Sequence, residues 1–167
     1  MFTKLCPPVS GIVLLKPLCD LGLKPLESLE VVVEKLRLIN QYTEDLKQMR
    51  GVTREEYVAD MVIQRAVERT FLNLVQSCVD LAQHVRSAED LSPSGTSKQE
   101  MEALENADVI TGATRSKMAE AVGFRNVLVH RYGDVDHDIV YDVLHENLAR
   151  FERFQTEVAQ WFQQYDS

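Results

Sequence analysis

Residues 71 to 85 read F-L-N-L-V-Q-S-C-V-D-L-A-Q-H-V, and the apolar residues of this stretch decide the fold. They recur three or four positions apart, which is the period of an α-helix, and they occupy more than one side of that helix. A helix that is apolar on several sides is buried among other helices. The stretch therefore predicts the central helix of an all-α protein.

Amphipathic patterns on both sides of this stretch predict its neighbours. The first helix covers residues 26–49 and ends before a glycine. Thr53 followed by Glu56 has the form of a capping box, so we expect the central helix to start there and to run to about residue 86. Asp136 can cap the last helix. Further helices are predicted over residues 97–107, 114–132 and 136–162.

These patterns predict an all-α, up-and-down bundle of four to five helices that occupies residues 26–167 as one domain. Four of the five prolines fall within residues 1–25, where no periodic pattern survives. We interpret that segment as an irregular N-terminal extension. The apolar positions on the first and last helices are numerous enough to favour a homodimer, in which a second copy buries some of them.

Composition and charge restrict the class of protein. The net charge of −8 argues against a protein that coats DNA or RNA, but it is compatible with an RNA-cutting enzyme that has a local basic site. No stretch approaches the roughly 18 to 20 continuous apolar residues of a membrane span, and no signal-peptide core is present. The three cysteines form no spaced motif, which is typical of a reducing compartment. We therefore expect a cytoplasmic protein that acts away from membranes.

No pattern of metal ligands is present. His130 and His137 are seven residues apart, but a predicted turn separates them. His145 has Asp142 and Glu146 nearby, but it has no second histidine at helical ligand spacing. We therefore predict no metal and no other cofactor. Asp80 and His84 share a helix face, where they could serve acid–base chemistry, and the lack of a third group favours an ordinary interface pair.

A polar cluster stands near the end of the helix predicted over residues 114–132. Residues 124–132 read F-R-N-V-L-V-H-R-Y, in which Phe124 and Leu128 are four apart and are expected to pack into the bundle. Arg125 and His130 point roughly 140° apart on a helix, so they flank a groove rather than meet. The length of the arginine, or a second copy of the helix, could bring the two groups together.

The residue types in this cluster suit RNA cleavage without a metal. His130 can remove or return a proton near neutral pH, and Arg125 can hold a phosphate through its forked guanidinium. Asn126 can orient the substrate or the histidine. The same residue types also cap helix ends and extend from them into water, so the spacing alone leaves both interpretations open.

The segment Phe124–Tyr132 resembles the R-x4-H-x-Y signature of HepT-like toxins of the HEPN superfamily. The resemblance extends from about Leu29 to Gln163 and includes the long helix that carries residues 66–84. It implies a metal-independent endoribonuclease, the toxin of a type II/VII-like toxin–antitoxin system. In that family two protomers pair so that their motifs face one cleft, which implies catalytic roles for Arg125 and His130, with Asn126 as companion.

The resemblance also implies the partners. RNA would be the substrate, cut by attack of a ribose 2′-hydroxyl on the adjacent phosphate to leave a cyclic phosphate end. A minimal nucleotidyltransferase antitoxin of the MntA-like kind would transfer AMP from ATP onto Tyr132, which would bring bulk and negative charge to the cleft. Arg131 is either an RNA contact or an ordinary surface arginine.

Two other functions are compatible with the sequence. A non-catalytic helical module could dock a nucleotidyltransferase and assist its substrate binding. A purely structural bundle is the third possibility. The RNA target cannot be named from the residues.

Overall fold

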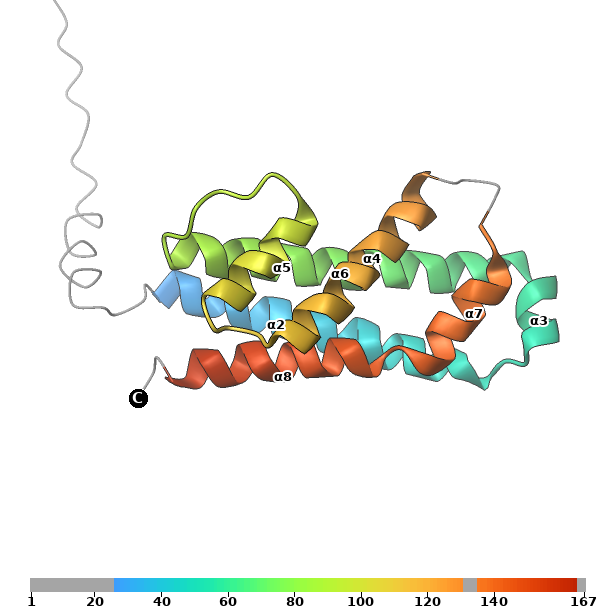
Figure 1. Ribbon diagram of the computed structural model, residues 1–167. Coiled ribbons are helices and arrows are strands. Elements are labelled where there is room, and N and C mark those ends of the chain that lie inside the picture. Colours follow the sequence, from blue (N-terminus) through green and yellow to red (C-terminus); the bar gives the residue numbers. More distant parts are fainter. Residues whose placement is uncertain (1–25, 131–134, 165–167) are drawn as a thin grey trace, which may run out of the picture.

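The computed structural model describes residues 26–130 and 135–164, and it confirms the all-α class (Figure 1). Helix α2 contacts α4 along one side and α8 along another, and α6 crosses obliquely between α8 and α4. None of the helices in this described part is long and apolar enough to cross a membrane. The elements are α2 (Leu26–Gln48), η1 (Met49–Gly51), α3 (Arg54–Ala59), α4 (Met61–Ala88), α5 (Ser97–Asn106), α6 (Gly112–His130), α7 (His137–Glu146) and α8 (Ala149–Gln164).

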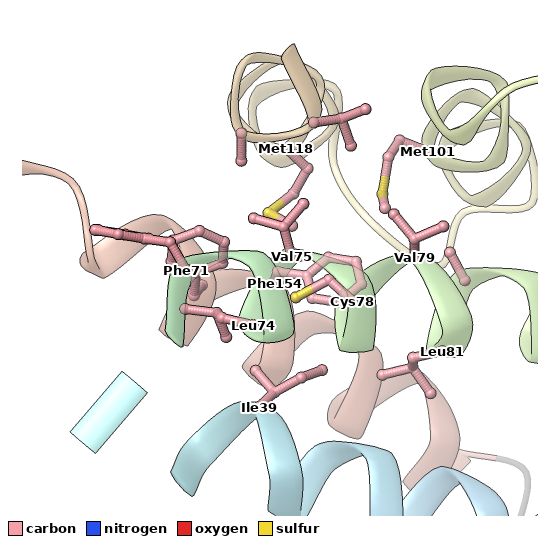
Figure 2. Packing of buried hydrophobic residues seen from close by; sticks show 14 of the residues in the cluster. Ile39, Phe71, Leu74, Val75, Cys78, Val79, Leu81, Met101, Met118 and Phe154 are labelled. Carbon is pink, nitrogen blue, oxygen red and sulfur yellow. The ribbon is translucent and has the colours of Figure 1, made fainter. Parts of the chain in front are cut away.

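Helix α4 is the centre of the bundle, as its sequence predicts. Val75 and Val79 point toward methionines of α6 and α5, whereas Leu74 and Leu81 point to the side of α2, the helix that carries Ile39 (Figure 2). All five of these side chains are almost completely buried. Helix α4 thus packs against α2 on one side and against α5 and α6 on another, and these contacts position α6.

Two polar contacts fix α2 between its neighbours. Asp80 of α4 accepts hydrogen bonds from Lys35 of α2 at 2.9 Å and from Gln76 at 2.6 Å. Gln155 of α8 donates to the backbone carbonyl of Leu36 at 3.1 Å. Asp80 therefore joins two helices, which agrees with an interface role.

The expected central helix is interrupted near its start. The capping box at Thr53 and Glu56 is present with both of its hydrogen bonds, but α3 ends at Ala59. Asp60 then has an extended backbone, and its carboxylate accepts from the amides of Val62 and Ile63, so it starts α4 as a new helix. The prediction of one uninterrupted helix from residue 53 is therefore wrong, because the helix is broken once, between α3 and α4.

The last helix is also divided, and one helix start is shifted. Asp136 caps α7 as predicted, by accepting from two backbone amides. Helix α7 ends at Glu146, and α8 begins at Ala149, so the predicted single helix from residue 136 is two helices. The side chain of Thr96 caps α5, which begins at Ser97 as predicted, whereas α6 begins at Gly112, before the predicted start at residue 114. The predicted extension, residues 1–25, lies outside the described residues.

Candidate active site

The last two turns of α6 present the polar cluster. Leu128 and Ala121 are buried, and the ring of Phe124 meets that of Phe71 on α4 edge-on, with 5.5 Å between centroids. These contacts confirm the predicted apolar line. They hold the helix by one side and leave its opposite side to solvent.

The three candidate residues on α6 lie in different surroundings. Asn126 and His130 are exposed, whereas Arg125 is half-buried, and its Nε atom is buried with no hydrogen-bond partner in the described residues. No hydrogen bond or ion pair recorded for the described residues joins the three to one another. Arg125 therefore lies partly against the protein, unlike the other two candidate residues.

Two further candidates cannot be placed. Arg131 and Tyr132 lie outside the described residues, so their predicted roles stay predictions. Of the helices before and after them in the chain, α6 packs on α4 and α7 packs on α3.

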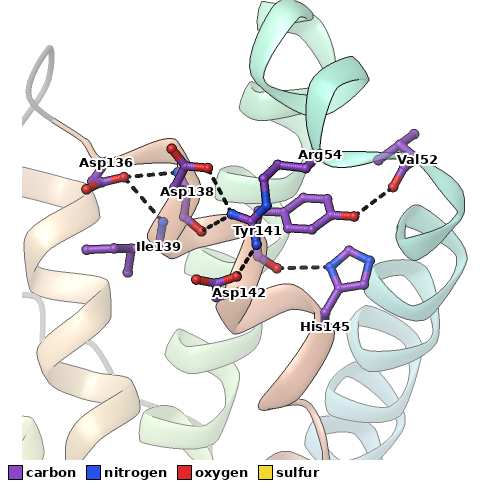
Figure 3. Close-up of polar contacts among 8 residues, drawn as sticks. All are labelled: Val52, Arg54, Asp136, Asp138, Ile139, Tyr141, Asp142 and His145. Carbon is purple, nitrogen blue, oxygen red and sulfur yellow. Dashed lines mark hydrogen bonds and ion pairs between the residues drawn. The ribbon is translucent and has the colours of Figure 1, made fainter.

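Helix α7 is fixed to α3 by a network around Tyr141 (Figure 3). Arg54 of α3 donates to Asp138 at 2.8 Å and to Asp142 at 2.5 Å, and its guanidinium lies 4.5 Å above the Tyr141 ring. The Tyr141 hydroxyl donates to the backbone carbonyl of Val52 at 3.2 Å. The two ring nitrogens of His145 lie 2.9 and 3.2 Å from backbone carbonyl oxygens, so contacts with the backbone hold this imidazole in place.

A second group of polar side chains is buried near the cluster, between α3, α4 and α7. Glu68 is 8% exposed, and it accepts from Arg65 through one oxygen at 3.2 Å. Its other oxygen lies 3.4 Å from Nδ1 of His137, and neither atom has a hydrogen-bond partner in the described residues. The hydroxyl of Tyr57 is also buried without a partner, and its ring lies edge-on to His137.

Burial, and then the charge of Glu68, raise the pKa of Tyr57 far above its usual value, so its hydroxyl stays protonated. Tyr57, Arg65 and Glu68 lie outside the motif that predicts the site. A usable signal was present, because Glu68 occurs three residues before Phe71 and seven before Val75, within the apolar stripe of α4. A carboxylate in such a stripe is buried and needs partners.

Metal ligands do not gather in this region. Among residues 26–130 and 135–164, no three His, Cys, Asp or Glu side chains form a group that could hold a metal ion. The polar side chains described near the end of α6 carry imidazole, guanidinium, amide, carboxylate and phenol groups.

Comparison with known proteins gives consistent matches. The family model described as "Ribonuclease HepT-like" matches residues 39–158. An mRNA nuclease HepT of Shewanella oneidensis is 25% identical over 125 residues, which cover 75% of this chain and 93% of the relative. A tRNA nuclease HepT of Aphanizomenon flos-aquae is 28% identical over 112 residues, 66% of this chain and 76% of the relative.

A solved structure shares the fold. It contains a tri-AMPylated Shewanella oneidensis HEPN toxin in complex with an MNT antitoxin. The likeness has a TM-score of 0.72 at 24% sequence identity, and it covers 78% of this chain and 97% of the toxin. The predicted bundle architecture is thus confirmed.

Proposed function

Because this chain belongs to the ribonuclease HepT-like family, we propose that it is an endoribonuclease, the toxin of a toxin–antitoxin system that acts in the cytoplasm. The observation that carries the proposal is the position of Arg125, Asn126 and His130 on the last two turns of α6, with the histidine exposed. Catalytic groups of a nuclease must reach an incoming RNA, and an exposed helix end permits that access.

The proposed reaction needs no metal ion. His130 takes the proton from a ribose 2′-hydroxyl, which attacks the adjacent phosphorus, while the 5′-oxygen of the next nucleotide leaves with a proton returned from an acid. Arg125 stabilises the negative charge that develops on the phosphate, and Asn126 orients the substrate. The products are a 2′,3′-cyclic phosphate and a 5′-hydroxyl.

A complete site uses two copies of the chain. On one helix the directions of Arg125 and His130 differ by about 140°. His130 comes five positions after Arg125, and each position turns the helix by roughly 100°. Val127, which lies between them in sequence, is an exposed apolar residue on the same helix. A second α6 packed across a two-fold axis buries such a residue and brings an arginine from one copy toward a histidine from the other.

The proposed regulator is a minimal nucleotidyltransferase antitoxin that transfers AMP from ATP to Tyr132. The tri-AMPylated state of the solved HEPN toxin in its antitoxin complex supports this proposal. Incubation with ATP and the cognate antitoxin should add one or more AMP units to the mass of the chain. Modification of Tyr132→Phe to the same extent would contradict the assignment.

Cleavage of purified RNA tests the proposed activity. The wild-type protein should cut tRNA or mRNA in the presence of EDTA and leave cyclic phosphate ends, and His130→Ala and Arg125→Ala should each lower the rate about a hundredfold or more. Arg37→Ala is the matched control, because Arg37 is an exposed arginine of α2 that pairs only locally, with Glu34 and Gln41.

Two results would contradict the proposal. One is the absence of cleavage of any RNA by the wild-type protein. The other is equal cleavage by the wild type and His130→Ala. An inactive wild type that still binds the nucleotidyltransferase would instead favour the non-catalytic docking module.

A further inference from the structure

A pocket of about 230 Å³ lies between α4 and α6. We propose that this pocket binds one nucleotide unit, with its phosphate on Arg69 and its apolar surface against Leu72 and Leu128. The proposal rests on the proposed ribonuclease function for the identity of the nucleotide, but not for the existence of the site. The residues that line it are Arg65, Glu68, Arg69, Leu72 and Leu128.

Arg69 provides the phosphate contact. Its side chain is exposed, and it forms no hydrogen bond or ion pair with any residue in the ranges 26–130 and 135–164. No residue in those ranges uses the donors of Arg69, and the planar fork of a guanidinium matches two phosphate oxygens. Most other arginines of the described part are already paired with carboxylates or backbone carbonyls.

Glu68 determines where in the pocket an anion can lie. Its carboxylate is buried and pairs with Arg65, so the lining carries two guanidiniums and one carboxylate, a net charge of +1. An anion is repelled from the buried end of the pocket near Glu68 and attracted to its exposed end near Arg69. The pair with Glu68 also fixes Arg65 at the pocket wall.

The other wall of the pocket is apolar. Leu128 is buried and Leu72 is half-buried, so together they offer a dry surface to a base or a ribose. The volume is below the roughly 300 to 1,000 Å³ of pockets that hold drug-sized ligands, so the pocket suits a single small unit and not a longer stretch of RNA. Guanidinium beside an apolar wall is the combination that a nucleotide needs.

The pocket lies on the arginine side of the motif. Leu128 and Arg125 are three residues apart, so they point within about 60° of each other, whereas His130 points about 160° away from Leu128. A nucleotide in the pocket therefore lies on the side of α6 from which Arg125 projects. Two sources supply such a unit, namely the RNA nucleotide beside the cleaved bond and an AMP attached to the motif.

Methyl resonances of Leu72 and Leu128 report occupancy of the pocket directly. Titration of the wild-type protein with AMP should shift both leucines in a saturable manner, whereas adenosine should shift them only weakly. Arg69→Ala should raise the Kd for AMP at least about tenfold. The Kd of Arg69→Lys should lie between those of the wild type and Arg69→Ala, because lysine keeps the positive charge but lacks the forked guanidinium. Arg37→Ala should bind AMP as the wild type does.

The proposal is overturned if AMP leaves the two leucines unshifted, or if Arg69→Ala binds AMP as tightly as the wild type. Two further arms identify the source. Displacement of AMP by a fully 2′-O-methylated oligoribonucleotide, which cannot be cleaved, assigns the pocket to RNA. Shifted leucines in the AMP-modified protein without added nucleotide assign it to the attached AMP. Failure of both arms also overturns the proposal.

Cleavage kinetics separate this site from the catalytic proposal. If the wild type cuts RNA, Arg69→Ala should raise KM and leave kcat nearly unchanged, since Arg69 does not contact the reacting atoms. An equal KM in the two proteins would contradict the pocket assignment but would not contradict the proposed ribonuclease activity. Conversely, AMP binding that depends on Arg69 in a protein that cuts no RNA would support the pocket and refute the ribonuclease.

Discussion

The two ends of the bundle differ in how completely their polar groups are satisfied. We define the motif end as residues 54–72, 124–130 and 137–142, and the threonine end as residues 101–118 and 153–161. Within the described part of the chain, all four buried side-chain atoms without a hydrogen-bond partner belong to the motif end. They are in Tyr57, Glu68, Arg125 and His137. At the threonine end, by contrast, Glu157 accepts hydrogen bonds from Thr111, Thr114 and Arg153.

The two ends also differ in how many large hydrophobic residues they expose. Five of the seven large hydrophobic residues exposed in the described ranges lie at the motif end, and Val62 is the most exposed of them at 77%. Each end has a pocket, but the one at the threonine end, of about 260 Å³, contains Asp108 and Glu157 and no basic residue. The motif end thus has unsatisfied polar atoms and exposed apolar side chains that a ligand or partner can use, whereas the carboxylate of Glu157 at the threonine end is satisfied within the chain.

The largest contrast is expected for Leu104→Ala against His130→Ala. Leu104 is fully buried at the threonine end, so its truncation should lower the free energy of unfolding by about 2 to 5 kcal/mol. His130 is exposed, so its truncation should change that energy by less than about 0.5 kcal/mol. Urea denaturation followed by circular dichroism measures both. A loss of unfolding free energy in His130→Ala as large as that in Leu104→Ala would contradict the difference between the two ends.

Glu157→Gln tests the threonine end through pH. Burial raises the pKa of Glu157, but hydrogen bonds from Thr111, Thr114 and Arg153 outweigh burial and lower the pKa below its usual value. The ionised carboxylate therefore stabilises the fold above the unfolded-state pKa of about 4.3, and this contribution is lost as pH falls through the lower folded-state pKa. We expect Glu157→Gln to cost about 1 to 3 kcal/mol at pH 7.

The control for this variant is the wild type at acid pH. The difference in unfolding free energy between the two proteins should shrink as the carboxylate becomes protonated, and it should be nearly absent once Glu157 is neutral in both states. A difference that stays constant from pH 7 to pH 3 would show that the charge of Glu157 has no part in the network.

Glu68→Gln is the matching change at the motif end, and its effect should be smaller. Removal of a buried carboxylate usually leaves an unpaired buried charge, but the Arg65 side chain is 56% exposed and stays hydrated. We expect a change below about 1 kcal/mol in either direction. Thermal denaturation of both glutamine variants in one buffer makes the comparison, and an equal loss at Glu68 and Glu157 would contradict it.

Much of the fold was predictable from apolar spacing. The burial of α4 on two sides, the cap at Asp136 and the packing of Leu128 all follow from periodicity and capping residues. The breaks at Asp60 and near Asn147 were missed, because an aspartate or an asparagine in a helical pattern is also common on exposed helix faces. Only the backbone conformation of Asp60 distinguishes a new helix start from a solvated side chain.

The residues proposed for the candidate site come from the sequence motif alone, whereas their surroundings come from the fold. The spacing of Arg125 and His130 gave their divergence on one helix, but the burial of the Arg125 Nε depends on how α6 leans on α4. Arg65 and Arg69 escaped notice because exposed arginines are frequent on helices. Their position beside Leu128 depends on contacts between α4 and α6, which no local pattern encodes.

Restoration of activity in mixed dimers tests the central claim most directly. Arg125→Ala and His130→Ala proteins, each inactive alone, are unfolded together and refolded, and RNA cleavage is measured with EDTA present. The shared site predicts activity well above that of either variant refolded alone, because one copy supplies Arg125 and the other supplies His130. No recovery in dimers shown to be mixed, or full activity of a wild-type monomer, would contradict the two-chain site.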